Sequence, residues 1–348
     1  MRVAVVNLTG GGFSGGYRKY LDALVPLLRE DRRVGALEVF GPASSRRDVS
    51  QLVPDVVFIP TARWSNFGTA PVVSMVRNME PLSVPFGGNG PLESSKNVAR
   101  AHVARKACGR ADRIIAGSDH VRDFLVDRGR IADSKVGVVE HGVDPPPPKE
   151  ATSRPPALRG DVAAGFFFTA GSVRPARGLE DAIRALKALS DRGFPLMLVV
   201  AGSSPPGGGR YEARMRRLAA ECGVDDRVTW IGQASAEEMS WCYHHCTCFL
   251  MTSRAEACPN VLLEAMAHGC LCVSVDRPPM TDMLGEPGLY YALGNPSALA
   301  DQLAAGVVLD GSERQRRQES TSARAARWTW SRTASETVAQ LELVTLRP

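Results

Sequence analysis

The alternation of β-branched runs with helical patterns constrains the fold more than any other feature of this sequence. In the first half, the apolar runs RVAVVNL (2–8), DVVFIP (55–60) and DRIIAGS (112–118) alternate with helical patterns such as GYRKYLDALVPLLRE (16–30). Strands and helices that take turns are typical of a parallel sheet covered on both faces. We therefore expect the first half to be a doubly wound α/β domain that ends with the strand VGVVEHGVD (136–144).

A proline-rich segment, PPPPKEATSRPPALRG (145–160), interrupts this alternation and is predicted to be an exposed linker. Beyond it the pattern restarts, with strand-like runs that include GFFFTAGS, LMLVVAG and CTCFLMTS. A chain of 348 residues suits two domains of about 150 residues each, which we place at 1–150 and 160–327. Two facing domains of this kind would leave an interdomain cleft at the carboxyl ends of their strands, which is the default ligand site.

Composition excludes several other classes of protein. The hydrophobic fraction of 44% and the charged fraction of 23% are those of a globular protein. No run of about 18 apolar residues indicates a signal peptide or a spanning helix, so we expect a cytoplasmic protein. The net charge of +5 is modest. Basic residues within 17–33 and 97–113 could meet anionic lipid or nucleic acid, but a solvated helix face is the simpler interpretation, and no interleaved aromatics favour nucleic acid.

The eight cysteines form no CxxC pair and occur mostly in strand-like apolar runs, so we expect reduced thiols. The segment WCYHHCTCF (241–249) crowds cysteines and histidines together as a metal site would. Its spacing matches none of the usual zinc patterns, and the segment is better interpreted as a helix that runs into a buried strand. We therefore expect no metal.

The stretch SRAEACPNVLLEAMAHGC places two glutamates, Glu256 and Glu264, eight positions apart. Glu256 lies in a loop that follows a predicted strand, and a helix begins near Pro259. Glu264 follows Asn260 by one helical turn, so the two share a face, while the N–H groups of Asn260, Val261 and Leu262 at the helix start favour hydroxyls and anions. Two such carboxylates could recognise a nucleotide sugar in two places, or they could be ordinary loop and surface residues.

The extended segment SRAEACPNVLLEAMAHGCLCVSVD resembles the E-x7-E segment of the retaining GT-B glycosyltransferases of family 4. GGYRKYLDALVPLL, ADRIIAGSDHVRDFL, VVEHGVD, FFFTAGSVRPARGLEDAIRAL and VTWIGQASAEEM resemble other segments of that family, in the same order. The likeness covers nearly the whole chain. It implies two Rossmann-like domains, retaining transfer of a sugar from a nucleotide donor without metal or cofactor, and a C-terminal helix that crosses back to the first domain.

The resemblance also implies roles for residues. Glu264 matches the glutamate that binds the ribose hydroxyls, and Glu256 the one that faces the donor sugar. Gly15 and Gly16 match glycines that let the backbone of the first domain approach the diphosphate, and without Cβ atoms they can adopt positive φ. The other residues expected at the donor are Gly171, Ser172, Gly232, Ala257, Cys258, Pro259, Asn260 and Val261.

The chain departs from the family at two places. Where the family has an arginine and a lysine that neutralise the leaving diphosphate, this chain has Ser172 and Arg177, with Arg174 as a stand-in for the missing arginine. Where the family often has a histidine near the donor sugar, the chain has Arg77 and Asn78. The expected catalytic residues are thus Glu256, Arg177, Arg174 and Asn78.

The acceptor is left open: a small molecule, a lipid carrier and a glycan end would all fit, and so would a weak peripheral membrane contact. Trp64, Asn66, Phe67 and Asn89 are candidate wall residues, although Trp64 and Phe67 could equally be packed core. Uridine and guanosine diphosphates are the expected donor nucleotides. Two alternatives share the nucleotide site: a GT-B nucleotide-sugar epimerase and a non-catalytic partner that binds a nucleotide sugar.

Overall fold

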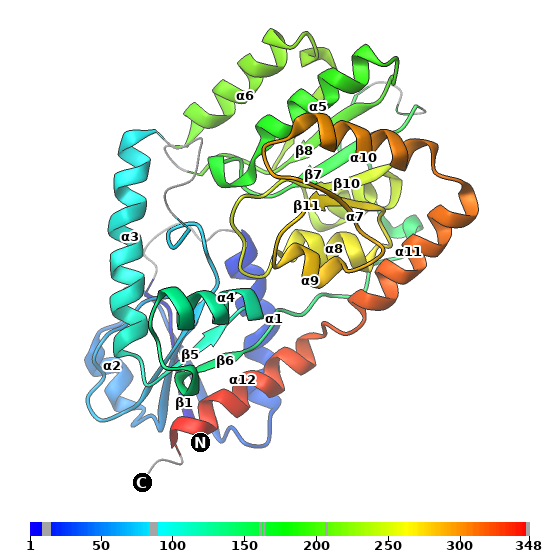
Figure 1. Ribbon diagram of the computed structural model, residues 1–348. Helices are drawn as coiled ribbons and strands as arrows, with labels where there is room; N and C mark the ends of the chain where they lie inside the picture. The colour runs from blue at the N-terminus through cyan, green and yellow to red at the C-terminus, as the bar shows by residue number, and fades with distance from the viewer. Residues whose placement is uncertain (9–14, 84–89, 160–161, 163, 206–207, 346–348) are drawn as a thin grey trace. The chain divides into compact units, whose positions relative to one another are not determined.

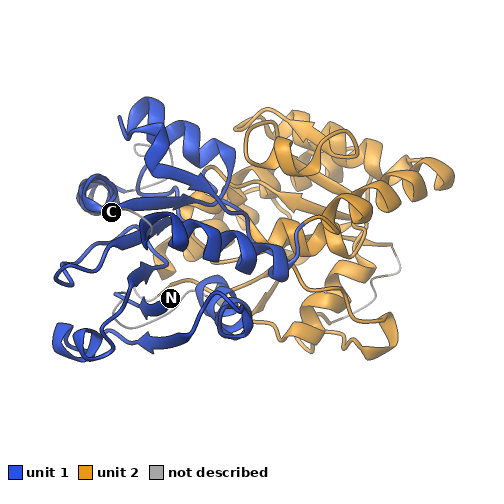
Figure 2. Ribbon diagram, turned by 90° about the horizontal axis from the view of Figure 1, so that it is seen from below, with its two compact units in different colours: residues 1–142, 255–258, 328–348 blue, residues 143–254, 259–327 orange. Residues whose placement is uncertain are grey.

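The computed structural model describes residues 1–8, 15–83, 90–159, 162, 164–205 and 208–345 (Figure 1). The chain forms two compact units, which Figure 2 distinguishes by colour. Unit 1 consists of Met1–Gly142, Ala255–Cys258 and Trp328–Pro348, and unit 2 of Val143–Arg254 and Pro259–Arg327. The short loop Ala255–Cys258 therefore groups with unit 1, although the residues on either side of it belong to unit 2.

Unit 1 is built on a six-stranded sheet with the order β2-β1-β3-β4-β5-β6, in which every neighbouring pair is parallel. The strands are β1 (Arg2–Val6), β2 (Ala36–Phe40), β3 (Val56–Ile59), β4 (Val72–Val76), β5 (Arg113–Ala116) and β6 (Val136–Val138). Successive residues of β1 and β3 belong to different hydrophobic clusters. Val3 and Val56 pack in one cluster, and Ala4 and Val57 pack in another. Since successive strand residues point to opposite faces, both faces of this sheet are covered.

The helices of unit 1 are α1 (Gly15–Glu30), α2 (Arg46–Gln51), α3 (Pro91–Arg110), α4 (Asp119–Asp123) and α12 (Trp330–Thr345), with a π-helical turn at Phe124–Arg128. The last helix, α12, runs beside α1 (Figure 1). Trp330, Val338 and Leu341 of α12 pack in the same cluster as Tyr20 and Leu24 of α1. The C-terminal helix is thus an integral part of the core of unit 1.

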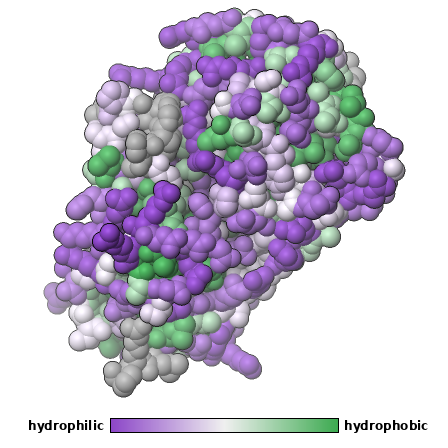
Figure 3. Space-filling model, in the orientation of Figure 1, coloured by the Kyte–Doolittle hydropathy of each residue, from purple (hydrophilic) through white to green (hydrophobic). Residues whose placement is uncertain are grey.

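Unit 2 repeats the plan with a second parallel six-stranded sheet, in the order β12-β11-β10-β7-β8-β9. Its strands are β7 (Phe166–Ala170), β8 (Met197–Ala201), β9 (Val228–Gly232), β10 (Cys248–Met251), β11 (Cys272–Val275) and β12 (Leu289–Tyr291). Its α-helices are α5 (Leu179–Asp191), α6 (Gly209–Glu221), α7 (Ala236–His245), α8 (Asn260–Ala267), α9 (Met280–Leu284), α10 (Pro296–Val308) and α11 (Gly311–Ala325). The surface over α11 is almost wholly hydrophilic (Figure 3). Two successive parallel sheets confirm the predicted α/β class with two Rossmann-like domains.

The predicted linker is exposed over most of 145–159, as expected, but two of its residues are buried. Pro155 and Leu158 are buried, and the carbonyl oxygen of Pro147 lies 2.9 Å from Nε2 of His244 in α7. The proline content correctly excluded a helix or strand of any length, and only a 3₁₀ turn forms, at Lys149–Ala151. The apolar Leu158 explains the difference, because it gains by leaving water.

Among the helices that the structure describes, none combines the length and the apolar character that crossing a membrane requires. The segment 241–249 is a helix that runs into a buried strand, as predicted: α7 ends at His245 and β10 begins at Cys248. All eight cysteines are free thiols. Within the described ranges, no three His, Cys, Asp or Glu residues gather as metal ligands would.

Candidate functional site

The carboxylate of Glu264 is fixed by a buried tyrosine. Glu264 is partly exposed in α8, and its Oε2 accepts a 2.9 Å hydrogen bond from the hydroxyl of Tyr243, which is also 3.3 Å from the carbonyl oxygen of Val261. Burial, followed by the negative charge of Glu264, raises the pKa of Tyr243 far above its usual value. The phenol therefore stays protonated and acts as a donor, which holds the carboxylate in one orientation beside the first turn of α8.

The start of α8 differs in one detail from the expectation. Pro259 is the N-cap residue, with extended backbone (φ −76°, ψ 102°), and α8 begins at Asn260. The N–H of Leu262, which was expected to point out of the helix, donates to the carbonyl oxygen of Pro259 at 3.0 Å. The chain turns tightly enough at the helix start for this hydrogen bond to span three residues. Donation to a ligand from the N–H groups of Asn260 and Val261 stays a prediction.

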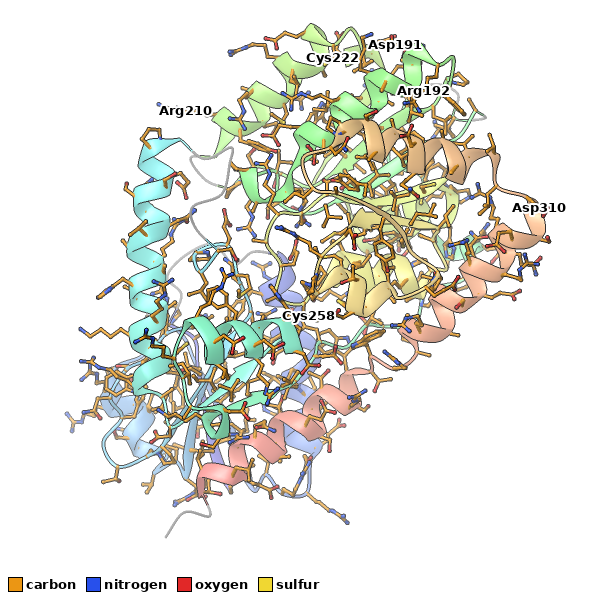
Figure 4. The ribbon with its side chains drawn as sticks, in the orientation of Figure 1. Asp191, Arg192, Arg210, Cys222, Cys258 and Asp310 are labelled. Carbon is orange, nitrogen blue, oxygen red and sulfur yellow. The ribbon has the colours of Figure 1, made fainter. Side chains whose placement is uncertain are left out.

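The other glutamate of the pair, Glu256, lies in the loop that groups with unit 1 and is partly exposed. Its neighbours Ala257 and Cys258 are buried, and both approach Gly117 at the end of β5. The backbone N–H of His141 lies 3.5 Å from Sγ of Cys258, labelled in Figure 4, and burial raises the pKa of that thiol to about 12. The backbone contacts to a ligand that were expected of Ala257 and Cys258 stay predictions.

Arg177 is the last residue of a 3₁₀ turn, Pro175–Arg177, that follows β7. Its Nη1 donates to Oγ of Ser253 at 3.0 Å, and its carbonyl oxygen accepts a 2.7 Å hydrogen bond from Oγ1 of Thr252. A Cβ on Gly171 would overlap the Arg177 guanidinium, so glycine is what lets this group lie across the end of β7. The guanidinium is thus directed by packing and by hydrogen bonds.

Ser172 and Arg174 lie between β7 and that turn, and both are partly exposed. Arg174 is the residue that precedes the 3₁₀ turn and has an extended backbone (φ −154°, ψ 161°). Its assignment as a stand-in for the missing arginine stays a prediction.

Three glycines end the neighbouring strands β7, β8 and β9. Gly171, Gly202 and Gly232 have positive φ angles of 118°, 118° and 68°. The N–H of Gly171 donates to Ala201 O at 3.0 Å, and the N–H of Gly202 to Gly232 O at 2.7 Å. Gly202 was not predicted from the sequence, although its position after the apolar run LMLVVA was a signal. Gly171 and Gly202 are covered by the Arg177 guanidinium and by the backbone of Gly171, whereas no atom lies within 4 Å of a Cβ placed on Gly232, so a ligand can approach the backbone there.

In unit 1, Arg77 does not present its guanidinium as the expected contact to a sugar. The guanidinium carbon lies 4.0 Å from the ring centroid of Tyr20, Nη2 donates to Gly16 O at 3.1 Å, and Nε donates to Nε2 of His141 at 3.3 Å. Burial lowers the pKa of Arg77. The side chain instead joins the end of β4 to the first turn of α1 and to the buried His141.

Asn78 is exposed, and its Oδ1 accepts a 3.0 Å hydrogen bond from the N–H of Glu80, which shapes the turn after β4. Its expected role at the sugar would thus fall to its amide nitrogen. Gly15 and Gly16 are the first residues of α1, whose helical pattern was predicted from Gly16 onward. Gly16 is therefore helical, and it is its carbonyl oxygen that contacts Arg77.

Of the candidate acceptor walls, Phe67 is packed core: it is 8% exposed and belongs to the cluster that contains Phe40 and Ile59. Trp64 is partly buried against the cores on this side of unit 1, with the Arg110 guanidinium 5.1 Å from its ring centroid. Asn66 is exposed and its Oδ1 accepts from Gly68 N at 3.0 Å, while Asn89 lies outside the described residues.

Comparisons with known proteins place the chain. The family model described as glycosyl transferases group 1 matches residues 159–324, and the model for Glycosyltransferase Family 4 matches residues 2–146. A D-inositol 3-phosphate glycosyltransferase from Stackebrandtia nassauensis is 30% identical over 236 residues, which cover 65% of this chain and 53% of that protein. A GDP-mannose:cellobiosyl-diphosphopolyprenol alpha-mannosyltransferase from Xanthomonas campestris is 26% identical over 220 residues, 63% of this chain and 55% of that one.

The chain spans about half the length of the curated relatives it matches. Among solved structures, that of Alr3699/HepE from Anabaena in complex with UDP has a TM-score of 0.73 and 17% identity, and the similarity covers 99% of this chain and 100% of that one. That likeness shows the fold. With the two family models covering both units in turn, the chain belongs to the family 4 (group 1) glycosyltransferases and has their GT-B fold of two Rossmann-like domains.

Proposed function

We propose that this protein is a retaining glycosyltransferase that moves a sugar from a UDP- or GDP-linked donor to a hydroxyl group of an acceptor and needs no metal. The observation that carries the proposal is the carboxylate of Glu264, which Tyr243 holds in place beside the start of α8. A carboxylate with two oxygens accepts hydrogen bonds from both hydroxyls of a ribose ring. In the proposed complex these hydroxyls bind to Glu264, and the diphosphate lies toward the helix start.

The leaving diphosphate gains negative charge as the bond from the sugar to its phosphate oxygen breaks. Arg177 supplies a guanidinium that is already oriented by Ser253, and the first turn of α8 supplies the positive end of a helix dipole. Groups fixed in advance stabilise developing charge without reorganisation, which is the main source of catalysis in such a site. Arg174 would add a second positive charge.

Family membership supports the proposal of retention, which does not depend on a carboxylate nucleophile. In the proposed reaction the acceptor hydroxyl attacks the anomeric carbon from the side that the diphosphate leaves, and the leaving phosphate oxygen takes the hydroxyl proton. Glu256 and the amide nitrogen of Asn78 would face the donor sugar. Two similar proteins support the two donor bases: one is a GDP-mannose-dependent mannosyltransferase, and Alr3699/HepE was solved with UDP.

The acceptor stays open, as a small molecule, a lipid carrier or a glycan, and Trp64, which is partly buried, stays a candidate contact. A weak membrane contact and a cytoplasmic location also stay predictions. The two alternatives, a nucleotide-sugar epimerase and a non-catalytic binding partner, predict different products from the donor alone, which makes the donor reaction the first test.

The test is to incubate the protein with a panel of UDP- and GDP-sugars in EDTA and to follow the anomeric protons by NMR. A retaining transferase slowly transfers the sugar to water, and the first sugar released has the anomeric configuration of the donor. Conversion to an epimeric nucleotide sugar would identify the epimerase. Binding of a donor with no turnover, even with a broad panel of acceptors, would favour the non-catalytic partner and contradict the proposal.

A further inference from the structure

Three consecutive residues after β10 form hydrogen bonds with the turn that carries Arg177. Thr252 donates its hydroxyl to the carbonyl oxygen of Arg177 at 2.7 Å, and Ser253 accepts from the Arg177 guanidinium at 3.0 Å. The N–H of Arg254 donates to the carbonyl oxygen of Ala176 at 2.8 Å. The turn therefore docks on residues 252–254 along its own backbone.

The side chain of Arg254 adds two further hydrogen bonds. Its Nη1 donates to the carbonyl oxygen of Pro175 at 3.3 Å, and its Nη2 donates to Oε2 of Glu180 at 3.2 Å. The Arg254 side chain is only 15% exposed and the Glu180 side chain 10%. A guanidinium can donate in two directions from one rigid plane, so Arg254 links the first residue of the turn to the first turn of α5.

Glu180 is in turn fixed from α6. Its Oε2 accepts a 2.8 Å hydrogen bond from the hydroxyl of Tyr211, and its Oε1 accepts from Arg214 at 2.5 Å. The Arg214 side chain is 46% exposed. Two arginines thus share one carboxylate, and the side chain of Arg254 also donates to the carbonyl oxygen of Pro175 in the turn that holds Arg177.

Close backbone packing removes the remaining freedom of the turn. Gly178, which follows Arg177, has a φ of 67°, and a Cβ there would overlap the carbonyl oxygen of Thr252. The backbone of the turn can therefore lie directly on that of residue 252. Without the side chain of Arg254, the carbonyl oxygen of Pro175 would keep the N–H of Gly178 as a donor within the turn, but the turn would lose its side-chain link to Glu180.

We infer that Arg254 is a positioning residue for Arg177: it holds the turn Pro175–Arg177 so that the guanidinium of Arg177 is in place for a diphosphate, and Glu180 orients Arg254 for this task. The inference rests on the proposed function, in which Arg177 binds the diphosphate of the donor. Arg254 acts through another residue and contacts no substrate. Its effect must therefore depend on the presence of Arg177.

The test is a double-mutant cycle on nucleotide binding. UDP and GDP are titrated into the wild-type protein and into Arg177→Met, Arg254→Met and the double variant, with Arg214→Met as the matched control. Arg254→Met should weaken binding about tenfold, nearly as much as Arg177→Met, because a charge-assisted hydrogen bond to phosphate is worth about a factor of ten or more. In the Arg177→Met background, Arg254→Met should change affinity less than twofold, whereas two independent residues would multiply their effects.

Thermal unfolding separates positioning from general stability. Arg214→Met and Arg254→Met each remove one partner of Glu180, so both should lower Tm, yet only Arg254→Met should weaken binding. If Arg254→Met does not fold, Arg254→Lys replaces it, because lysine keeps the charge and the apolar stem but lacks the rigid fork. Full affinity in the folded Arg254 variant, equal losses in the Arg214 control, or additive losses in the cycle would each overturn the inference. A wild-type protein that binds neither nucleotide would instead refute the proposed function, and the inference with it.

Discussion

Tyr243 and Glu264, at the end of one helix and in the middle of the next, are joined by a 2.9 Å hydrogen bond from a phenol to a carboxylate. The tyrosine is 3% exposed, whereas the glutamate is partly exposed. A buried donor therefore orients an accessible acceptor. This relationship turns a carboxylate that could be an ordinary surface group into one with a fixed direction, which is what the recognition of a diol requires.

Replacing Tyr243 by phenylalanine removes the donor while the ring stays in place. We expect UDP or GDP to bind about three to ten times more weakly, because Glu264 is free to rotate, and the free energy of unfolding to fall by about 1 kcal/mol. Calorimetric titration and urea unfolding measure the two effects. Tyr290→Phe is the control, since the Tyr290 hydroxyl bonds only to the carbonyl oxygen of Gly285; an equal loss of affinity there would refute the role of Tyr243.

Two glycine-to-alanine substitutions in unit 2 are predicted to differ greatly in their cost to the free energy of unfolding. A Cβ on Gly202 would overlap the backbone oxygen of Gly171, and its φ is 118°. Gly223 also has a positive φ, of 65°, but no atom lies within 4 Å of a Cβ placed there. Gly223→Ala should cost about 1 kcal/mol of stability, and Gly202→Ala about 3 kcal/mol or more, since a backbone clash adds to the strain. Similar unfolding midpoints for the two variants would contradict this geometry.

Two leucines of α12 test whether this helix belongs to the core of unit 1. Leu341 is completely buried, whereas Leu343 is 47% exposed. Leu341→Ala should lower the free energy of unfolding by about 2 to 5 kcal/mol, and Leu343→Ala by less than about 0.5 kcal/mol. Denaturant unfolding of the two variants gives both numbers. Equal effects would mean that α12 packs differently from its position here.

Acid should weaken the anchorage of α12 through one ion pair. Arg33, which also contacts Glu342 of α12, donates to both carboxylate oxygens of Asp31, at 2.9 and 2.6 Å, and lowers the pKa of Asp31 from 3.8 to about 2. Because the folded pKa lies below the unfolded one, the stabilisation is complete above about pH 5 and is lost as the pH falls toward 2. It amounts to about 1 to 2 kcal/mol for these partly buried groups.

The check is the pH dependence of urea unfolding. Asp31→Asn should be less stable than the wild-type protein at pH 7, and the difference should shrink between pH 5 and pH 2. Asp226→Asn is the comparison, because Asp226 is exposed and belongs to unit 2, whereas Arg33 belongs to unit 1. A constant difference between Asp31→Asn and the wild-type protein across this range would exclude the ion pair as its cause.

Local patterns predicted most of the fold but few of the contacts. The β-branched runs at 55–60 and 112–118 are strands because their apolar residues are buried on both faces, a property that sequence reports directly. The segment Asn260–Ala267 is helical for similar reasons of pattern. Tyr243, in contrast, could not be assigned to Glu264, because the pairing depends on how α7 packs against α8.

The same limit explains the other differences. Arg77 has the residue type of a sugar or phosphate ligand, but the rings of Tyr17 and Tyr20 and the carbonyl oxygen of Gly16 take up its guanidinium. Phe67 has the residue type of a stacking platform, but its side chain is buried in the core and is not accessible to a ligand. Which partner a polar or aromatic side chain finds is a tertiary property. Residue type and spacing therefore predict candidate ligand-binding residues, and the packing of the folded chain determines which of them can reach a ligand.

The central claim is that Glu264 binds the ribose of a nucleoside diphosphate, and one titration tests it most directly. UDP and GDP are titrated in EDTA into the wild-type protein and into Glu264→Gln, which keeps the shape of the side chain and an acceptor for Tyr243 but removes the charge. The account predicts that one nucleotide binds with a stoichiometry of one, and that the variant binds it at least about tenfold more weakly. Unchanged affinity in Glu264→Gln, or no binding of either nucleotide to the wild-type protein, would contradict it.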